Sequence, residues 1–401
     1  MAASQIPIAY AVILGNSTAW LKALHDRYGS VVRVGPNELS YADAQSWRDI
    51  YGSHPTRRAG MPRDLAGFAS MEEGTGVSSL VTASEADHMR MRSAYTHFFS
   101  NQALASQEPL ITSYVDKFIA RLYGAAGQQV NMVDMFSFLF FDIIADFHFG
   151  ESLRLLEEPT HVPWVKSQFG YIRSSQMLAT LMDFPWVMMF SRLIPSGYIK
   201  KQRDAYFRFT NERLEQRLAV ESDRPDIVHL AFHAPEKRTL TKGELRANTP
   251  LFMFAGSDTT TTLLSGLLVL LGQHSAVMKR LTQEIRSAFR TSSDINMKKL
   301  RELEYLDACI KEAHRIYPAV PIPMPRVVPR PGAEISGRWV PAGTRVYSSP
   351  FSTQRSTANF YDPHAFRPER WLMDADVCFS SDNKAAFQPF SLGPRSCLGQ
   401  E

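Results

Sequence analysis

The stretch Phe390-Ser-Leu-Gly393-Pro-Arg395-Ser-Cys397-Leu-Gly399 places a cysteine on a glycine-rich loop, at a point where a helix would begin. Backbone N–H groups and the positive end of the helix dipole stabilise a thiolate at such a point. A thiolate is a good iron ligand, and N–H donors to its sulfur tune the potential of the metal. The glycines permit close approach of a flat cofactor, and Arg395 is placed to neutralise an acidic edge of it. If this motif stood alone, a buried inert cysteine beside a chance arginine would explain it better.

A second motif, Ala255-Gly256-Ser257-Asp258-Thr259-Thr260, lies in the middle of a long apolar stretch that the sequence predicts to be a helix. A threonine hydroxyl here can donate back to the carbonyl of Ala255, which opens the helix locally and leaves room for a small ligand or water. An acid beside an alcohol on an apolar surface suits a proton relay. A polar interruption satisfied by neighbouring helices explains this motif alone equally well.

Charged side chains at helical spacing form two further motifs. Glu312-Ala-His-Arg315 puts opposite charges three residues apart on one helix face, and Pro368-Glu-Arg370-Trp adds an arginine downstream. A surface pair of this kind stabilises a helix weakly and is common, so by itself it indicates no function. His88-x-x-x-Arg92 places two basic side chains on one face of a helix. These side chains could bind a carboxylate, but an ordinary solvent-exposed helix face explains the spacing equally well.

Together, in this order along the chain, the four motifs resemble those of the cytochrome P-450 haem-thiolate monooxygenases. The resemblance extends over about residues 20–401, and Val31-Val-Arg-Val-Gly-Pro-Asn-Glu-Leu-Ser40 looks like the microsomal members of filamentous fungi, many of which act in secondary metabolism. It implies a mainly α fold with small β-sheets, and it implies that residues 1–401 form a single domain.

The resemblance also implies a role for each matching residue. Cys397 matches the thiolate ligand of the haem iron, and it is the metal ligand that we expect. The positions that match the binding of haem b are Cys397, Phe390, Gly393, Arg395, His88, Arg92, Arg326, Ala255 and Gly256. Four of these match ligands of the haem propionates, namely His88, Arg92, Arg326 and Arg395.

The remaining matches concern chemistry, scaffold and substrate. Asp258 and Thr259 match the acid–alcohol pair that delivers protons to bound dioxygen. A buried structural triad is matched by Glu312, Arg315 and Arg370. The positions that match the wall of the substrate cavity are Ala319, Val320, Ile322 and Met324, together with residues 53–83 and 182–195. The expected partners are a lipophilic small molecule, such as a terpenoid or polyketide, and NADPH–cytochrome P-450 reductase, which would dock on the cysteine side.

The amino-acid composition excludes several classes of protein. The 401 residues are 44% hydrophobic, which is enough for a large core and excludes a disordered chain. The net charge of +4 comes from scattered basic residues, so nucleic-acid binding is not expected. The other cysteines, Cys309 and Cys378, are expected to be packing or surface residues. Residues 251–271 are apolar enough for a membrane span, but Asp258 at their centre would cost roughly 2.5–3.5 kcal/mol there, so a buried helix is favoured.

Two departures from the family pattern leave two hypotheses open. Residues 1–19 look like a remnant of the N-terminal region without a recognisable transmembrane anchor, and four residues follow Cys397 where relatives continue with a helix and strands. We therefore expect a fold that lacks those C-terminal elements. The family indicates the endoplasmic reticulum membrane, whereas the missing anchor indicates a cytoplasmic or peripheral protein. The chain is either a monooxygenase or a catalytically inactive, haem-poor paralogue or gene fragment with at most an interaction role.

Overall fold

The structure is a computed structural model, which describes residues 3–54, 60–65, 76–158, 162–184, 196–222, 224–235 and 237–400. The chain divides into two compact units. The first unit comprises residues 1–64 and 263–397, and the second comprises residues 65–262 and 398–401. The long helix α11 (Lys242–Gln273) runs through both, so its first two-thirds belong to the second unit.

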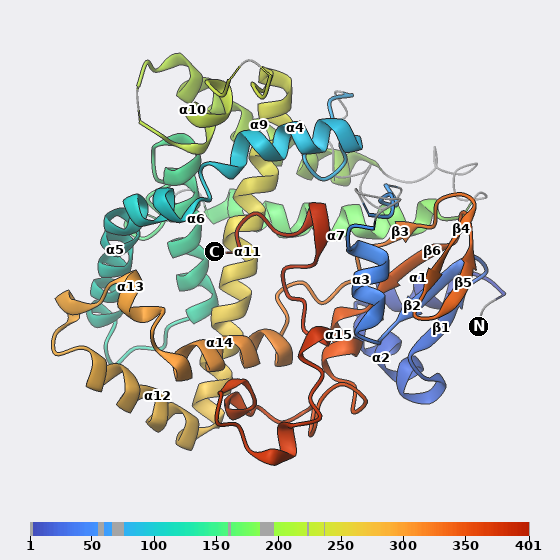
Figure 1. Ribbon diagram of the computed structural model, residues 1–401. Coiled ribbons are helices and arrows are strands. Elements are labelled where there is room, and N and C mark those ends of the chain that lie inside the picture. The colour runs from blue at the N-terminus through green and yellow to red at the C-terminus, as the bar shows by residue number, and fades with distance from the viewer. Residues whose placement is uncertain are drawn as a thin grey trace. The chain divides into compact units, whose positions relative to one another are not determined.

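The first unit contains a four-stranded sheet in the order β1-β2-β6-β3. Its strands are β1 (Val31–Gly35), β2 (Glu38–Tyr41), β3 (Arg326–Val327) and β6 (Arg345–Ser348). The turn residues Gly35-Pro36-Asn37 between two strand-like stretches predict strands here, and β1 and β2 pair as an antiparallel hairpin. On its other edge, β2 pairs in parallel with β6. Figure 1 shows the blue N-terminal strands beside the orange C-terminal ones, so both ends of the chain build one sheet.

Residues 336–347 have the sequence pattern of two strands joined by a turn at Pro341–Gly343. Both strands are present, but they belong to different sheets. β5 (Arg338–Pro341) pairs with β4 (Gly332–Ile335) in a separate two-stranded sheet, and β6 joins the larger one. The turn at residues 342–343 therefore carries the chain from one sheet to the other.

The first unit also contains several helices, of which the first three contact its sheets. Their bounds are α1 (Ile6–Ile13), α2 (Ser17–Tyr28), α3 (Gln45–Tyr51), α12 (Ser275–Ala288), α13 (Met297–Leu300), α14 (Glu304–Ile316) and α15 (Pro350–Gln354). On α14, buried residues recur every three or four positions, as in Tyr305, Ala308 and Glu312, so one face of this helix packs into the core. The chain from residue 355 to 397 follows in coil and short 3₁₀ turns, one of which is η8 (Gly393–Arg395).

The described residues of the second unit form helices joined by loops and contain no strand. Besides the start of α11 it contains α4 (Glu85–Thr96), α5 (Asn101–Gly124), α6 (Met132–Phe149), α7 (Val162–Met182), α9 (Ser196–Ala219) and α10 (Ile227–Phe232). The sequence predicts an N-cap at Ser84 and a capping box in Thr241-x-x-Glu244, and both are confirmed. The Ser84 side chain accepts from the N–H of Asp87, and Thr241 and Glu244 form the reciprocal capping box of α11. The mainly helical fold with small sheets is thus confirmed.

A helical pattern in the sequence predicts a helix from about Ser106, but α5 begins earlier, at Asn101. The Ser100 hydroxyl accepts from the N–H of Ala103 and caps the helix there, and Pro109 lies inside it. Among the described helices, α11 is long and apolar enough to cross a membrane, a test that a core helix also passes.

Candidate functional site

The loop around Cys397 is closed by backbone hydrogen bonds. The N–H of Cys397 donates to the carbonyl of Phe390 at 2.9 Å, and the N–H of Ser396 donates to the carbonyl of Gly393 at 3.0 Å. Cys397 is exposed. Cys309, by contrast, is buried on α14, and burial raises the pKa of its thiol to about 12. Cys397 is therefore the accessible thiol on an ordered loop, whereas Cys309 is held as an inert packing residue, as expected.

Gly393 is required by the geometry of this loop. Its φ of +75° lies in the left-handed region, and a Cβ atom there would lie 2.1 Å from the carbonyl oxygen of Tyr51. Tyr51 is the last residue of α3, and its hydroxyl donates to the carbonyl of Met324 at 3.0 Å. The loop is thus seated directly on the end of α3.

Three guanidinium groups gather near this loop, within the first unit. Arg63 and Arg326 face each other across an isolated antiparallel bridge, and the Arg326 guanidinium lies 5.4 Å from the ring of Tyr51. Burial, followed by the like charges of Arg326 and Arg395, lowers the pKa of Arg63 to about 9. We call Arg63, Arg326 and Arg395 the cation cluster; mutual repulsion of this kind is relieved when an anion binds.

Arg63 belongs to none of the four sequence motifs. It lies in the glycine- and proline-rich region of residues 53–83, where no periodic pattern marks it. It meets Arg326 because the N–H of Asp64 donates to the carbonyl of Pro325 and the N–H of Val327 donates to the carbonyl of Pro62. No local signal in the sequence indicates this long-range pairing.

Glu312, Arg315 and Arg370 meet in the core of the first unit, and all three side chains are completely buried. Both Glu312 oxygens accept from Arg315, at 2.8 and 2.9 Å, and Oε1 also accepts from Nε of Arg370 at 3.1 Å. The remaining donors of Arg315 reach three backbone carbonyls on residues 354–365. The triad therefore fastens α14 to the irregular segment that leads to Cys397.

In the second unit, α11 presents the predicted acid and alcohol. The Thr259 hydroxyl donates to the carbonyl of Ala255 at 2.7 Å, which confirms the expected bond back along the helix. The carboxyl of Asp258 is half-buried, and burial raises its pKa, so it takes up a proton more readily than an exposed aspartate. A Cβ atom at Gly256 would lie 2.7 Å from the Ile144 side chain of α6, so glycine here lets the two helices approach closely.

The other predicted positions are spread over both units. His88 is buried on α4, and Arg92 lies one turn further along the same helix and is half-buried. The segment of residues 319–324 is a coil between α14 and β3, in which Ala319, Val320 and Met324 are half-buried and Ile322 is exposed. Residues 55–59, 66–75 and 185–195, in the regions expected to line the substrate cavity, lie outside the described residues.

Comparison with known proteins identifies the relatives of this chain. The family model of the cytochromes P450 matches residues 12–401. The cytochrome P450 monooxygenase aneG of Aspergillus aculeatus is 40% identical over 401 residues, which cover all of this chain and 76% of that protein. The cytochrome P450 monooxygenase efuB of Hormonema carpetanum is 38% identical, over all of this chain and 80% of its own length. Among solved structures, the cytochrome P450DA heme domain superposes with a TM-score of 0.77 at 17% identity, covering 96% of this chain and 82% of that one, and so shares the fold.

Proposed function

The chain belongs to the cytochrome P450 family, and we propose that it is a haem-dependent monooxygenase that inserts one oxygen atom from O2 into a lipophilic small molecule in fungal secondary metabolism. Similarity to fungal monooxygenases over the whole chain supports the reaction. The alternative, an inactive haem-poor remnant, is not supported by these relatives.

The observation that carries the proposal is the seating of the Cys397 loop beside the cation cluster. Haem b presents an iron atom that takes a thiolate ligand and two propionate groups that are anionic. The accessible thiol of Cys397 suits the iron. Burial, followed by the like charges of Arg326 and Arg395, lowers the pKa of Arg63 to about 9, and a propionate would offset the repulsion between these charges. The residues present therefore fit this cofactor, which supplies the activation of O2 when it is bound.

Individual residues then have definite tasks. Arg63, Arg326 and Arg395 would hold carboxylate groups of the haem. His88 and Arg92 are proposed as carboxylate ligands from their match to the family motif alone. Thr259 would hold a proton at Oγ1 and pass it on by turning from the Ala255 carbonyl, and Asp258 would replace that proton, because burial raises its pKa.

The segment before β3 supports the apolar character of the substrate. Its predicted wall positions are aliphatic or thioether side chains, Ala319, Val320, Ile322 and Met324. Burial of such side chains against a ligand favours a lipophilic substrate. Family membership further supports electron supply from NADPH through NADPH–cytochrome P450 reductase and association with the endoplasmic reticulum membrane.

A spectrum of the reduced, carbon-monoxide-bound protein tests the proposal. The 401-residue chain should show the red-shifted Soret band of a thiolate-ligated haem, Cys397→Ala should lose it, and Cys378→Ala should keep it. Persistence of the band in Cys397→Ala would overturn the ligand assignment. With NADPH and reductase, labelled O2 should add a single labelled atom to product, and incorporation from water instead would exclude a monooxygenase.

A further inference from the structure

α10 and the residue that follows it carry two histidines one helical turn apart. His229 and His233 are four positions apart, and in an α-helix this spacing places both side chains on the same face. The opposite face, with Ile227, Val228 and Ala231, is buried in the second unit. His229 is half-buried and His233 is exposed. The two imidazole rings therefore lie at the surface, on a helix whose other face is held by the core.

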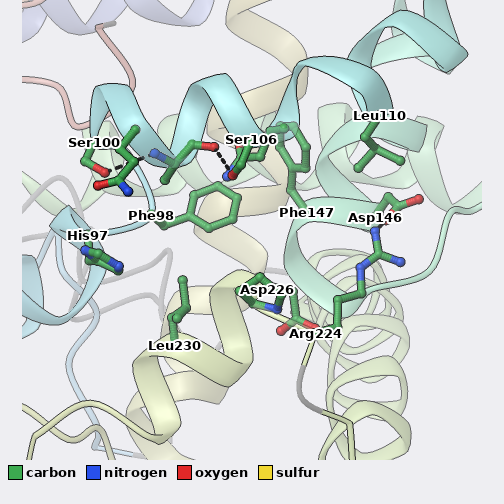
Figure 2. A pocket seen from close by; sticks show the side chains of 14 residues that line it. His97, Phe98, Ser100, Ser106, Leu110, Asp146, Phe147, Arg224, Asp226 and Leu230 are labelled. Carbon is green, nitrogen blue, oxygen red and sulfur yellow. Dashed lines mark hydrogen bonds and ion pairs between the residues drawn. The ribbon is translucent and has the colours of Figure 1, made fainter.

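The backbone beneath these rings is fixed at both ends. Oδ1 of Asp226 accepts from the N–H of His229 at 2.8 Å, and its other oxygen accepts from Nε of Arg217 at 2.7 Å. Figure 2 shows Asp226 at the start of α10, together with Leu230, which lines a neighbouring cavity. At the other end, the N–H of His233 donates to the carbonyl of His229 at 2.9 Å. A helix of six residues is not stable by itself, so these contacts hold the two histidines in place.

The two imidazole rings face each other. Their centroids are 4.4 Å apart and their planes meet at 31°. Nδ1 of His233 lies 3.0 Å from the carbonyl oxygen of His229. Because a carbonyl oxygen only accepts, Nδ1 carries the proton of the neutral His233 ring, and Nε2 keeps its lone pair. Histidine ligands of metal ions usually donate their other N–H to an acceptor of this kind, so His233 has the tautomer of a metal ligand.

The spacing and type of these nitrogen donors specify the ion. Zn–N bonds of about 2.0–2.1 Å in a tetrahedral site put two nitrogens about 3.3 Å apart. Rings whose centroids are 4.4 Å apart reach that separation by small side-chain rotations. Imidazole suits Zn²⁺, Ni²⁺ and Cu²⁺, whereas Mg²⁺ and Ca²⁺ prefer oxygen ligands. Since the described residues include no group of three or more metal-binding side chains, water would complete the coordination sphere and the ion would bind reversibly.

We propose that His229 and His233 form a two-histidine site for a divalent transition-metal ion of the Zn²⁺, Ni²⁺ and Cu²⁺ group. A bound ion would tie the body of α10 to its last residue. The chain that leads to α11 is joined to the same helix, because the N–H of Leu240 donates to the carbonyl of Ala231 at 3.3 Å. The ion would therefore stabilise the end of α10 and this connection. The inference does not rest on the proposed function, since neither histidine is assigned to haem, proton delivery or substrate.

Calorimetric titration of the haem-loaded chain with Zn²⁺ tests the site. His229→Ala and His233→Ala should each weaken Zn²⁺ binding about tenfold, because the second ring no longer binds as an intramolecular ligand. The double variant should bind no more weakly than either single variant, since losing one ring already abolishes the chelate. His364→Ala is the matched control, because His364 is also exposed but lies in the first unit, and it should leave the affinity unchanged. Circular dichroism verifies that each variant is folded.

A second cation and a thiol variant complete the test. Mg²⁺ should show no saturable binding, because the site offers nitrogen rather than oxygen ligands. Cys397→Ala should bind Zn²⁺ as the wild-type chain does although monooxygenase activity is lost, so failure of this proposal is distinguishable from failure of the proposed function. No saturable binding of Zn²⁺ to the wild type, unchanged affinity in either single variant, additive losses in the double variant, or weakening by His364→Ala or Cys397→Ala would each overturn the metal site.

Discussion

Replacing Glu312 with glutamine tests the buried triad directly. The Glu312 carboxylate accepts five hydrogen bonds: two from Arg315, one from Arg370, one from the Trp371 indole at 2.9 Å and one from the N–H of Arg367 at 2.9 Å. Glutamine has nearly the same shape, but it turns an –NH2 group toward some of these donors and removes the negative charge.

The expected loss of folding stability follows from the arginine charge that Glu312→Gln leaves buried without its counter-ion. Arg315 keeps carbonyl partners but loses its counter-ion, whereas Arg370 keeps an ion pair with Asp382 at 2.6 Å. Breaking a buried ion pair by removing one partner destabilises proteins by about 3–5 kcal/mol. Because native stability is about 5–15 kcal/mol, this loss is a large part of the total.

Urea denaturation followed by circular dichroism measures the effect. With an m-value of about 3 kcal/mol/M, the midpoint of Glu312→Gln should fall by about 1–1.7 M. Asp307→Asn on the same helix is the matched control, since its pair with Lys311 is exposed and should contribute less than about 1 kcal/mol. If both variants shift the midpoint equally, the triad does not hold α14 in place and the reasoning is wrong.

Three further changes test other parts of the site. Thr259→Ala should lower the amount of product formed per NADPH consumed about tenfold, because reduced O2 is then released without oxygenating the substrate. Thr260→Ala should change this ratio little. Arg63→Ala should reduce retained haem at least twofold, measured as the ratio of Soret to protein absorbance. Arg33→Ala is the control, because Arg33 is the exposed side chain of β1, and equal retention in the two variants would contradict the cation cluster. Burial lowers the pKa of His148 to about 3, against about 6.5 in an unfolded chain, so the unfolded state binds the extra proton first and stability is lost as pH falls below about 6.5. Between pH 7 and 5 this group should cost about 2 kcal/mol in urea unfolding, and His148→Phe should remove that part of the pH dependence.

The sequence predicts helix caps and hairpins well, because residues close together in the chain determine them. The Ser84 cap, the capping box at Thr241 and the hairpin of β1 and β2 all depend on side chains within a few residues of one another. The back-bond of Thr259 to Ala255 is of the same kind, since helical spacing alone sets its geometry.

Features that join distant segments are not predictable in this way. The parallel pairing of β2 with β6 joins residues about 300 positions apart. This pairing places β6 in a different sheet from β5, whose own partner β4 is only a few residues away. Local sequence does not indicate the role of Arg63 either, because Arg63 joins the cation cluster only through its bridge to Arg326. The roles of Cys397, Asp258 and Thr259 came from the order of the motifs along the chain, and they stay predictions.

Tyr51 shows why the site depends on such long-range contacts. Its backbone carbonyl lies where a side chain at Gly393 would stand, its ring lies beside the guanidinium of Arg326, and its hydroxyl donates to Met324 in the segment expected to line the substrate cavity. One residue at the end of α3 therefore contacts the cysteine loop, the cation cluster and the predicted substrate wall. Burial raises the pKa of its hydroxyl to about 12, so it stays a neutral donor over the physiological range. The geometry around Cys397 is thus set by α3 and the sheet as much as by the loop itself.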